Sequence, residues 1–309
     1  MAILCWMHTV YGDKLINGVR EQLPDEDVRN YPDIGDPNDI EACIVFRMPP
    51  GFLKQFPNLK LISTTGAGID HYLLDPDLPR SVPLVRIVDA DFGARMADYV
   101  TSWVLFYHRE IAHFMESQRR HEWAYKPIRS ASEVIVGVMG LGQMGSVSAS
   151  RLAALGYTVR GWSRGRHFMD GVKCYAGPDE FDEFLSGTEI LVNLLPLTAE
   201  TKNILSRDTF AKLPKGAVVI SAGRGGHLNE QDLSEALADG TLRAATIDAF
   251  PKEPLPKDHP FWANPKVYVT PHCSSTPTPE TIYNTFAENV RRFRAKKPLL
   301  NLVDYAKGY

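Results

Sequence analysis

Short apolar runs alternate with amphipathic stretches along most of the chain, a pattern that predicts strands followed by helices. The N-terminal part predicts strands at Ile3–Met7, Cys43–Arg47, Leu59–Ser63 and Leu84–Val88, and a helix from Lys14 to Leu23 that ends before Pro24. The later part predicts strands at Val134–Gly140, Thr158–Trp162, Ile190–Leu195, Ala217–Ser221, Ala244–Ile247 and Val267–Thr270. Strands that alternate with helices are typical of an α/β protein with parallel sheets.

Two longer helical patterns accompany these two series of strands. Apolar residues spaced three and four apart between Met96 and Phe114 predict one helix from Ala94 to about Gln118, and a last helix is expected from Pro279 to about Lys296. The polar residues 119–132 are expected to be a linker. We therefore predict two α/β domains, residues 1–98 with 276–309 and residues 99–275, with the two long helices as the crossovers between them.

Composition excludes several classes of protein. The chain has 309 residues, of which 44% are hydrophobic and 23% charged, and its net charge is −3. A general nucleic-acid or anionic-membrane binder would need a basic excess. The longest apolar run, Val134 to Gly142, is shorter than the roughly 18 residues that a membrane span needs. We predict no nucleic-acid partner and no membrane partner.

The cysteines and histidines carry no metal or disulfide pattern. Cys5, Cys43, Cys174 and Cys273 are scattered without a C-x-x-C, and the nine histidines include no H-E-x-x-H. No signal peptide is visible, because the N-terminus lacks a basic region and its apolar segment is interrupted early by His8 and Asp13. These features predict a protein of the reducing cytoplasm with no metal site.

A glycine-rich turn follows the expected strand that begins at Val134. Its sequence is Gly140-Leu141-Gly142-Gln143-Met144-Gly145, and a helical stretch follows it up to Gly156. In this context G-x-G-x-x-G predicts dinucleotide binding: the first glycine permits a tight turn, the second lets a pyrophosphate approach, and the third lets helix and strand pack closely. The alternative is a tight turn in another doubly wound fold.

The end of the next strand bears on which dinucleotide is bound. An NAD site would place an acidic residue here to accept from the ribose 2′-OH, but Ser163 and Arg164 occupy these positions. A hydroxyl and a guanidinium suit a 2′-phosphate, which predicts NADP, with NADPH preferred over NADH. The alternative is a solvated basic turn, because Arg160 and Arg166 are also near.

Polar residues gather where the other strands of this series end. In open α/β sheets ligands bind beyond the carboxyl ends of strands. Those ends are Gly140, Ser163, Leu195-Pro196, Ala222-Gly223-Arg224, Asp248 and His272. Arg224, Asp248 and His272 each have a structural explanation taken alone, but their occurrence at successive strand ends favours a ligand site.

Several stretches of the chain match a family pattern: GLGQMG (140–145), LLPLTAET (194–201), SAGRGGHL (221–228), IDAFPKEPLP (247–256), HPFWANPKVYVTPH (259–272) and TTGAGID (64–70). Together they resemble the D-2-hydroxyacid dehydrogenase family. Within it, WSR (162–164), SVPLVR (81–86), KEPLP (252–256) and VDYAKGY (303–309) resemble the glyoxylate/hydroxypyruvate reductase A group. The resemblance implies a Rossmann-type dinucleotide-binding domain and a flavodoxin-like substrate domain. It also implies a homodimer.

The resemblance also assigns residues to roles. It implies Arg224, Glu253 and His272 as the catalytic residues, Asp248 on the nicotinamide side, and Gly66-Ala67-Gly68 as a substrate loop. Spacing alone would leave Glu253 a surface acid and the 66–68 loop a plain turn. The chain departs from the family at Cys273-Ser274-Ser275, Asn229 and Arg47, which leaves its substrate preference open. Arg47 is a further candidate for substrate binding.

The assigned residues suit reduction of a 2-keto acid. A nicotinamide supplies the hydride. His272 can supply the proton because imidazole changes charge near neutral pH, and Glu253 would favour the protonated ring. The Arg224 fork can hold the substrate carboxylate, and the amides near Ala67 can form a nest for it.

The sequence therefore predicts an NADPH-dependent reductase of glyoxylate and hydroxypyruvate. Two alternatives remain open: a reductase of bulkier 2-keto acids, and a non-catalytic dinucleotide-sensing protein on the same fold.

Overall fold

The computed structural model describes residues 2–6, 12–45 and 48–305. The chain divides into two compact units, residues 1–91 with 276–309 (unit 1) and residues 92–275 (unit 2). Every helix among the described residues is too short or too polar to span a bilayer. The fold class predicted from the sequence, α/β with two doubly wound domains, is confirmed.

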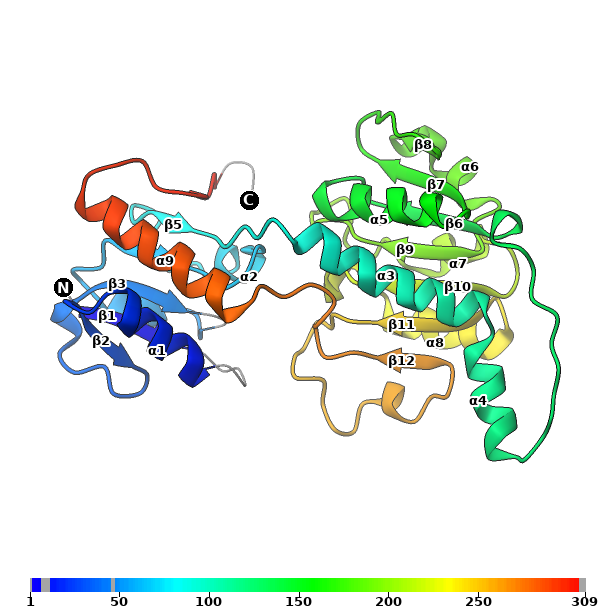
Figure 1. The fold of residues 1–309 in the computed structure, drawn as a ribbon, viewed down its shortest axis with the longest axis horizontal. Coiled ribbons are helices and arrows are strands. Elements are labelled where there is room, and N and C mark those ends of the chain that lie inside the picture. Colours follow the sequence, from blue (N-terminus) through cyan, green and yellow to red (C-terminus); the bar gives the residue numbers. More distant parts are fainter. Residues whose placement is uncertain (1, 7–11, 46–47, 306–309) are drawn as a thin grey trace. The chain divides into compact units, whose positions relative to one another are not determined.

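Unit 1 is built on a parallel five-stranded sheet with strand order β2-β1-β3-β4-β5. This is the flavodoxin-like order. The strands are β1 (Ala2–Trp6), β2 (Asp27–Asn30), β3 (Ile40–Val45), β4 (Leu61–Ser63) and β5 (Leu84–Val85), and the helices are α1 (Gly12–Gln22), α2 (Asp70–Leu73) and α9 (Pro279–Arg294), with 3-10 turns η1 (Pro37–Asp39) and η2 (Phe52–Gln55). Helices α1 and α9 pack side by side (Figure 1).

Unit 2 is built on a parallel seven-stranded sheet with strand order β12-β11-β10-β9-β6-β7-β8. Its strands are β6 (Ile135–Met139), β7 (Thr158–Ser163), β8 (Val172–Ala176), β9 (Ile190–Asn193), β10 (Ala217–Ser221), β11 (Leu242–Ile247) and β12 (Val267–Val269). The strand order reverses between β6 and β9, as in the dinucleotide-binding fold.

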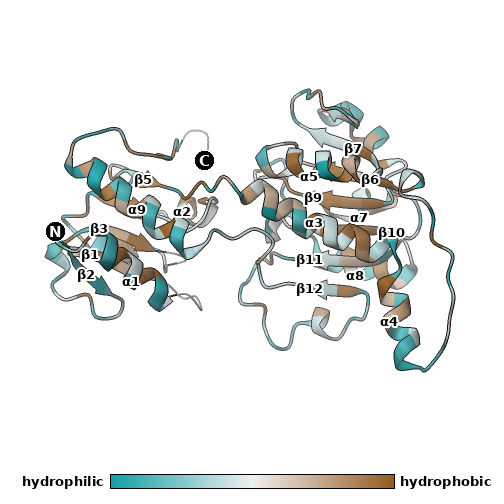
Figure 2. Cartoon of the chain, in the orientation of Figure 1, coloured by the Kyte–Doolittle hydropathy of each residue, from teal (hydrophilic) through white to brown (hydrophobic). Residues whose placement is uncertain are grey.

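The helices of unit 2 connect these strands. They are α3 (Phe92–His108), α4 (Ile111–Arg119), α5 (Gln143–Ala154), α6 (Phe181–Leu185), α7 (Arg207–Ala211) and α8 (Glu230–Asp239), with 3-10 turns η3 (Ala131–Glu133), η4 (Pro178–Glu180), η5 (Gly225–His227) and η6 (Pro260–Trp262). Helices α3 and α5 lie against each other over the sheet (Figure 1). The central strands are the most hydrophobic segments (Figure 2), because both of their faces are buried.

The structure corrects three predictions about the elements. The single helix expected from Ala94 to Gln118 is two helices, because Glu110 has a left-handed φ of 55° between them. The Glu110 carboxylate forms ion pairs with Lys126 and Arg243, at 2.8 and 3.6 Å. No glycine or proline marks this break.

The predicted domain boundary at 98/99 falls inside α3, and the structure places it at 91/92. Helix α3 is continuous from Phe92 and packs along α5, so all of it belongs to unit 2. The sequence pattern also missed the edge strands β2 and β8, whose exposed positions dilute their apolar signal.

Candidate functional site

The glycine-rich turn joins β6 to α5 at the carboxyl edge of the unit 2 sheet. Gly140 has a φ of 94°, and a Cβ there would lie 2.9 Å from the Leu194 carbonyl oxygen. A Cβ on Gly145 would lie 1.7 Å from the Gly140 carbonyl oxygen, so only glycine fits at either position.

The space in front of α5 suits a phosphate group. Gly142 is the N-cap of α5 and forms no side-chain cap hydrogen bond, and a Cβ placed on it would meet nothing within 4 Å. The first amides of α5 therefore face open space with the positive end of the helix dipole behind them. Leu141 is buried beneath this turn, whereas Gln143 is exposed and Met144 half-buried beside it.

Three arginines lie within or after β7, and their environments differ. Arg160 donates to the carbonyl oxygen of Glu183 at 3.0 Å. Arg166 donates to the carbonyl oxygen of Cys174 at 3.0 Å and pairs with Glu180, whose pKa the Arg166 hydrogen bond lowers. The exposed Arg164 guanidinium forms no hydrogen bond or ion pair within the described part of the chain.

Ser163 and Arg164 lie together at the end of β7. The Ser163 hydroxyl donates to the Gly165 carbonyl oxygen at 2.8 Å, which fixes the turn. The pKa of Glu200 is lowered mainly by its hydrogen bond with Thr198, and the charge of Arg164 adds to that effect. Of the three arginines, Arg164 is therefore the one whose charge is available to an anion at this edge.

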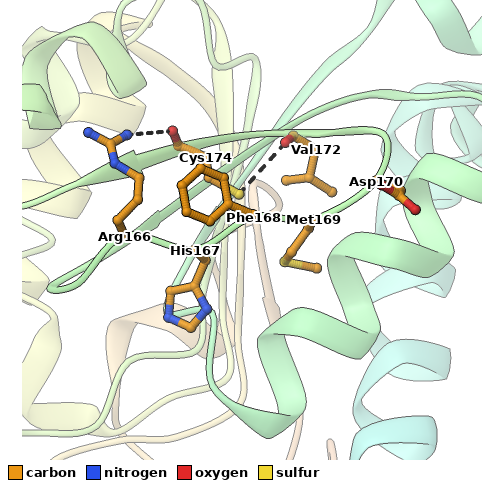
Figure 3. A pocket seen from close by; sticks show the side chains of 7 residues that line it. All are labelled: Arg166, His167, Phe168, Met169, Asp170, Val172 and Cys174. Atoms are coloured by element: carbon orange, nitrogen blue, oxygen red, sulfur yellow. Dashed lines mark hydrogen bonds between the residues drawn. The ribbon is translucent and has the colours of Figure 1, made fainter.

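A pocket of about 500 Å³ lies beside this strand end, lined by residues 166–170 with Val172 and Cys174. Figure 3 shows Arg166 bonded to the Cys174 carbonyl at one side of it and Phe168 over its centre. Phe168 is 92% exposed, so the pocket is open to solvent. The residues predicted for catalysis do not line it, and the site lies instead along the strand ends.

Asp248 organises the chain after β12. It directly follows β11 and is 1% exposed. Its Oδ1 accepts from the Thr270 hydroxyl at 2.6 Å and the Cys273 amide at 2.9 Å, and its Oδ2 accepts from the Ser274 amide at 3.1 Å. These bonds supply the donors that a buried carboxylate needs, and they hold the turn that carries His272.

Tyr99 of α3 extends this network. Because the Thr270 hydroxyl donates to Asp248, the Tyr99 hydroxyl donates to Thr270, at 2.7 Å. Burial raises the pKa of Tyr99, and the negative charge of Asp248 raises it further. Tyr99 thus remains a donor, and α3 is tied to the turn after β12.

His272 and Glu253 form the paired titratable groups of the site. The ring nitrogen Nδ1 of His272 lies 2.9 and 3.1 Å from the two carboxylate oxygens of Glu253, whose Oε1 also accepts from the Phe250 amide at 2.8 Å. The Glu253 side chain is 12% exposed and that of His272 35%. Nδ1 therefore donates to Glu253, and Nε2, which forms no hydrogen bond among the described residues, faces away from that pair.

The backbone of His272 is held in an uncommon conformation. Its φ is 53°, a left-handed value that few residues with a Cβ adopt. Its amide donates to the carbonyl oxygens of Asp248, at 2.9 Å, and Thr270, at 3.0 Å. Surrounding hydrogen bonds thus maintain a strained residue, an arrangement that concentrates at functional sites.

Arg224 lies on the turn after β10, next to the segment that carries Glu253. A Cβ on Gly225 would lie 2.0 Å from the Phe250 carbonyl carbon and 2.2 Å from the Pro251 nitrogen, so the two main chains touch. The structure therefore brings the Arg224 turn and the Glu253–His272 pair to the same sheet edge. Ala222, Gly223 and Leu195 are buried there, whereas Pro196 is exposed.

The loop Gly66-Ala67-Gly68 belongs to unit 1, where it follows β4. The Gly66 amide donates to Thr64 Oγ1 at 3.0 Å, and the Gly66 carbonyl accepts from Ile87 at 3.0 Å. The amides of Ala67 and Gly68 form no hydrogen bond within the described residues and lie in half-buried backbone. Arg47, the remaining predicted substrate residue, lies outside the described residues.

Sequence reasoning missed the residues that support this site. The sequence assigned no role in the site to Thr270, Phe250, Tyr99 and Gly225, and Tyr99 was interpreted as a core or subunit-contact residue. Each of the four binds or contacts the chain beside His272, Glu253 or Arg224. The doubled glycine after Arg224 was the one local signal, since adjacent glycines indicate close backbone approach.

Comparisons with known proteins show the family to which the chain belongs. Residues 101–274 match the family described as D-isomer specific 2-hydroxyacid dehydrogenase, NAD binding domain. The chain is 36% identical over 302 residues to the glyoxylate/hydroxypyruvate reductase A of Serratia proteamaculans, covering 96% of each chain.

Two solved structures are similar over nearly their whole length. One is a D-isomer specific 2-hydroxyacid dehydrogenase from Xanthobacter autotrophicus Py2 in complex with NADPH and MES, 39% identical with a TM-score of 0.88, covering 100% of this chain and 99% of that one. The other is an NADPH-dependent glyoxylate/hydroxypyruvate reductase from Sinorhizobium meliloti in complex with NADP and sulfate, 34% identical with a TM-score of 0.89 and the same coverage.

Proposed function

Because the chain belongs to the D-isomer specific 2-hydroxyacid dehydrogenase family, we propose that it is an NADPH-dependent reductase of small 2-keto acids. The proposed reactions convert glyoxylate to glycolate and hydroxypyruvate to D-glycerate. The observation that carries the proposal is the His272–Glu253 pair, 2.9 Å apart, at the sheet edge that also bears the glycine-rich turn and Arg224. The similarity to a glyoxylate/hydroxypyruvate reductase A supports the proposed substrates. The similarity to a reductase solved in complex with NADP supports the proposed cofactor.

The residues that would hold NADPH fit that molecule. The open space at Gly142 and the uncapped start of α5 suit the pyrophosphate, and Ser163 with the available Arg164 suits the 2′-phosphate. When bound, the reduced nicotinamide supplies the hydride. The segments Leu195-Pro196 and Ala222-Gly223 follow the next strands of the same edge and would contact the cofactor, with Asp248 beyond them.

His272 supplies the proton in the proposed mechanism. Its Nδ1–H is held by Glu253, so Nε2 is the nitrogen that donates to the keto oxygen as that oxygen gains charge. The Glu253 carboxylate accepts from Nδ1 and so fixes the orientation of the ring. The ring is then reprotonated from solvent, which the 35% exposure of its side chain allows.

Arg224 orients the substrate. Its guanidinium is planar and carries a fork of donors, which matches a carboxylate in two-point contact and can also polarise the neighbouring keto oxygen. In unit 1, the amides of Ala67 and Gly68 form no hydrogen bond among the described residues and suit an anion, so we propose unit 1 as the substrate domain and unit 2 as the dinucleotide-binding domain. Arg47 remains a hypothesis for substrate preference, tested by the effect of Arg47→Ala on the hydroxypyruvate preference.

The decisive experiment is a panel of 2-keto acids of graded size, each assayed with NADPH and with NADH. We expect the highest kcat/KM with glyoxylate or hydroxypyruvate and NADPH. Higher values with bulky keto acids would assign the chain to another substrate class of its family. Absence of NADPH oxidation with every acid would refute the catalytic proposal and favour a dinucleotide sensor.

We further propose a homodimer. Trp123 and Tyr125 are 102% and 85% exposed, and α4 exposes Met115 at 47%. Large apolar side chains that gather in one exposed segment are typical of an interface. Tyr99, Trp103 and Tyr107, by contrast, pack into the core of unit 2. Light scattering coupled to gel filtration tests this, with Trp123→Glu expected to shift a dimer toward monomer.

The proposed compartment is the cytoplasm. The four cysteines are all free, two of them buried, which suits a reducing environment. Cell fractionation with an antibody to the chain tests this assignment.

A further inference from the structure

A buried hydrogen-bonded group lies beneath the Arg224 turn and has no part in the chemistry proposed above. It consists of His227 in η5, Asn193 at the end of β9 and Ser221 at the end of β10. His227 and Asn193 are 0% exposed. Asn193 and Ser221 are register partners in the sheet, so the group sits where the two strands end.

The hydrogen bond between Arg224 and His227 fixes the proton of the imidazole. The Arg224 main-chain amide lies 3.0 Å from His227 Nδ1. An amide N–H can only donate, so Nδ1 carries a lone pair and the ring proton is on Nε2. The ring is therefore neutral, because a charged ring would place an N–H against the amide of Arg224.

The same reasoning fixes the orientation of Asn193. Its Nδ2 lies 3.1 Å from His227 Nδ1 and 3.2 Å from Ser221 Oγ, and donates to both. Its Oδ1 then accepts from the Leu195 amide at 3.3 Å. One chain of hydrogen bonds thus connects the main chain of Arg224 with the Leu195-Pro196 segment on the cofactor side.

The imidazole also packs directly against the main chain that precedes Arg224. A Cβ on Gly223 would lie 2.8 Å from His227 Nδ1 and 3.1 Å from Asn193 Nδ2. The main chain of His227 closes the turn from the other side, since its amide donates to the Arg224 carbonyl at 3.1 Å. His227 therefore holds both main-chain groups of Arg224: its ring accepts from the Arg224 amide, and its own amide donates to the Arg224 carbonyl.

We propose that His227 is a positioning residue whose neutral imidazole sets the main chain of Arg224, so that the guanidinium meets the substrate carboxylate in two-point contact. The proposal rests on the role assigned to Arg224 in the proposed function. A two-point contact requires that the guanidinium be held to a fraction of an ångström. Arg224 lies on a turn, where the hydrogen bonds of its main chain contribute to that precision together with the bond from its own Nη1 to the Gly223 carbonyl oxygen at 3.0 Å.

Two substitutions at His227 test the proposal. His227→Leu removes the acceptor and leaves the Arg224 amide buried without one, whereas His227→Asn places an amide oxygen near the position of Nδ1. With saturating NADPH we expect His227→Leu to raise the KM for glyoxylate about tenfold or more, the scale of a lost bond to a buried donor, and His227→Asn to recover most of this. The Kd for NADPH, measured by fluorescence, should change less than about threefold, because Arg224 acts on the substrate.

Thr188→Val is the matched control. Thr188 is 0% exposed, and its hydroxyl donates to the Phe184 carbonyl at 2.7 Å, before β9 begins and away from the carboxyl edge. This variant should lower Tm as His227→Leu does but leave the KM for glyoxylate unchanged. If His227→Leu lowers only Tm, or if His227→Asn gives no recovery, the positioning role is wrong.

The tautomer of the His227 ring can be measured in the wild-type chain. This test requires neither enzymatic activity nor a variant that folds. Nitrogen-15 NMR of the histidine rings in the wild-type chain should show His227 protonated on Nε2 alone. A proton on Nδ1 would overturn the inference, even if the wild type reduces glyoxylate. If the wild type reduces no keto acid, the proposed function fails, and the NMR result still decides whether the His227 geometry is correct.

Discussion

The carboxyl edges of the two sheets are built very differently. At the edge of unit 2, Asp248, Thr270, Glu253 and His272 are joined by hydrogen bonds of 2.6 to 3.1 Å. In unit 1, Trp6 at the end of β1 stacks on Tyr31, which follows β2, at 3.9 Å and packs against Phe52 of η2 at 4.4 Å. After β4, unit 1 offers the amides of Ala67 and Gly68, which form no hydrogen bond among the described residues, whereas the Thr64 hydroxyl accepts from the Gly66 amide.

The two edges suit different functions, proton donation at the edge of unit 2 and anion binding at the edge of unit 1. A proton donor must keep one orientation and a defined charge, which requires partners for each ring nitrogen and carboxylate oxygen. Main-chain amides do not ionise near neutral pH and so cannot serve as general acids, but they hold an anion without any charged side chain. We therefore expect substitutions at His272 and Glu253 to lower kcat, and substitutions in the unit 1 loop after β4 to affect the KM for the substrate alone.

The largest effect is expected at His272. His272→Ala removes the proton donor, and kcat for glyoxylate should fall at least about a hundredfold. The Kd for NADPH should remain near the wild-type value, because the substitution leaves the glycine-rich turn intact. Stopped-flow kinetics and fluorescence titration measure the two quantities, and near-normal turnover in a folded variant would remove His272 from the mechanism.

A somewhat smaller effect is expected at Arg224. Arg224→Lys keeps the charge but loses the planar fork, so the KM for glyoxylate should rise about tenfold or more and kcat should also fall. Steady-state kinetics with saturating NADPH test this. Unchanged constants would mean that the guanidinium points away from the substrate.

Cofactor choice should depend on Arg164 alone among the arginines of this region. Arg164→Ala should raise the KM for NADPH about tenfold and leave that for NADH unchanged, since only NADPH carries the 2′-phosphate. Arg166→Ala is the control, because Arg166 is already bonded to Glu180 and the Cys174 carbonyl.

The companion variant reverses the preference. Ser163→Asp places a carboxylate where it repels the 2′-phosphate and accepts from a 2′-OH, so NADPH should bind more weakly and NADH more tightly. Initial rates over a range of each cofactor measure both effects. A wild-type enzyme that prefers NADH would show that Ser163 and Arg164 do not form a phosphate site.

The smallest effect is expected in unit 1. Thr64→Val is nearly isosteric and removes the acceptor that holds the Gly66 amide at 3.0 Å. The loop should become less ordered, raising the KM for glyoxylate about threefold with kcat unchanged. A fall in kcat without a change in KM would contradict the division between the two edges.

Much of the fold was predictable because its signals are local. The glycine-rich turn and the strands on either side of it follow from consecutive residues, and six strand ends named from the sequence lie at one edge in the structure. The edge strands β2 and β8 were missed because partial exposure weakens their apolar pattern. The break at Glu110 was missed because ion pairs with Lys126 and Arg243, distant in sequence, accompany it.

By itself, the sequence determined the α/β class, the glycine-rich turn and the residue types at the strand ends, since each depends on neighbouring residues. Tertiary structure alone decided which of these residues meet. Glu253 and His272 are 19 positions apart, His227 and Asn193 are 34 apart, and Tyr99 and Thr270 are 171 apart. Their contacts depend on the order of strands in the sheet and on main chains that touch, as at Gly225 and Phe250. No local pattern encodes the strand order, and the doubled glycine after Arg224 indicates a close approach without identifying the segment that it meets.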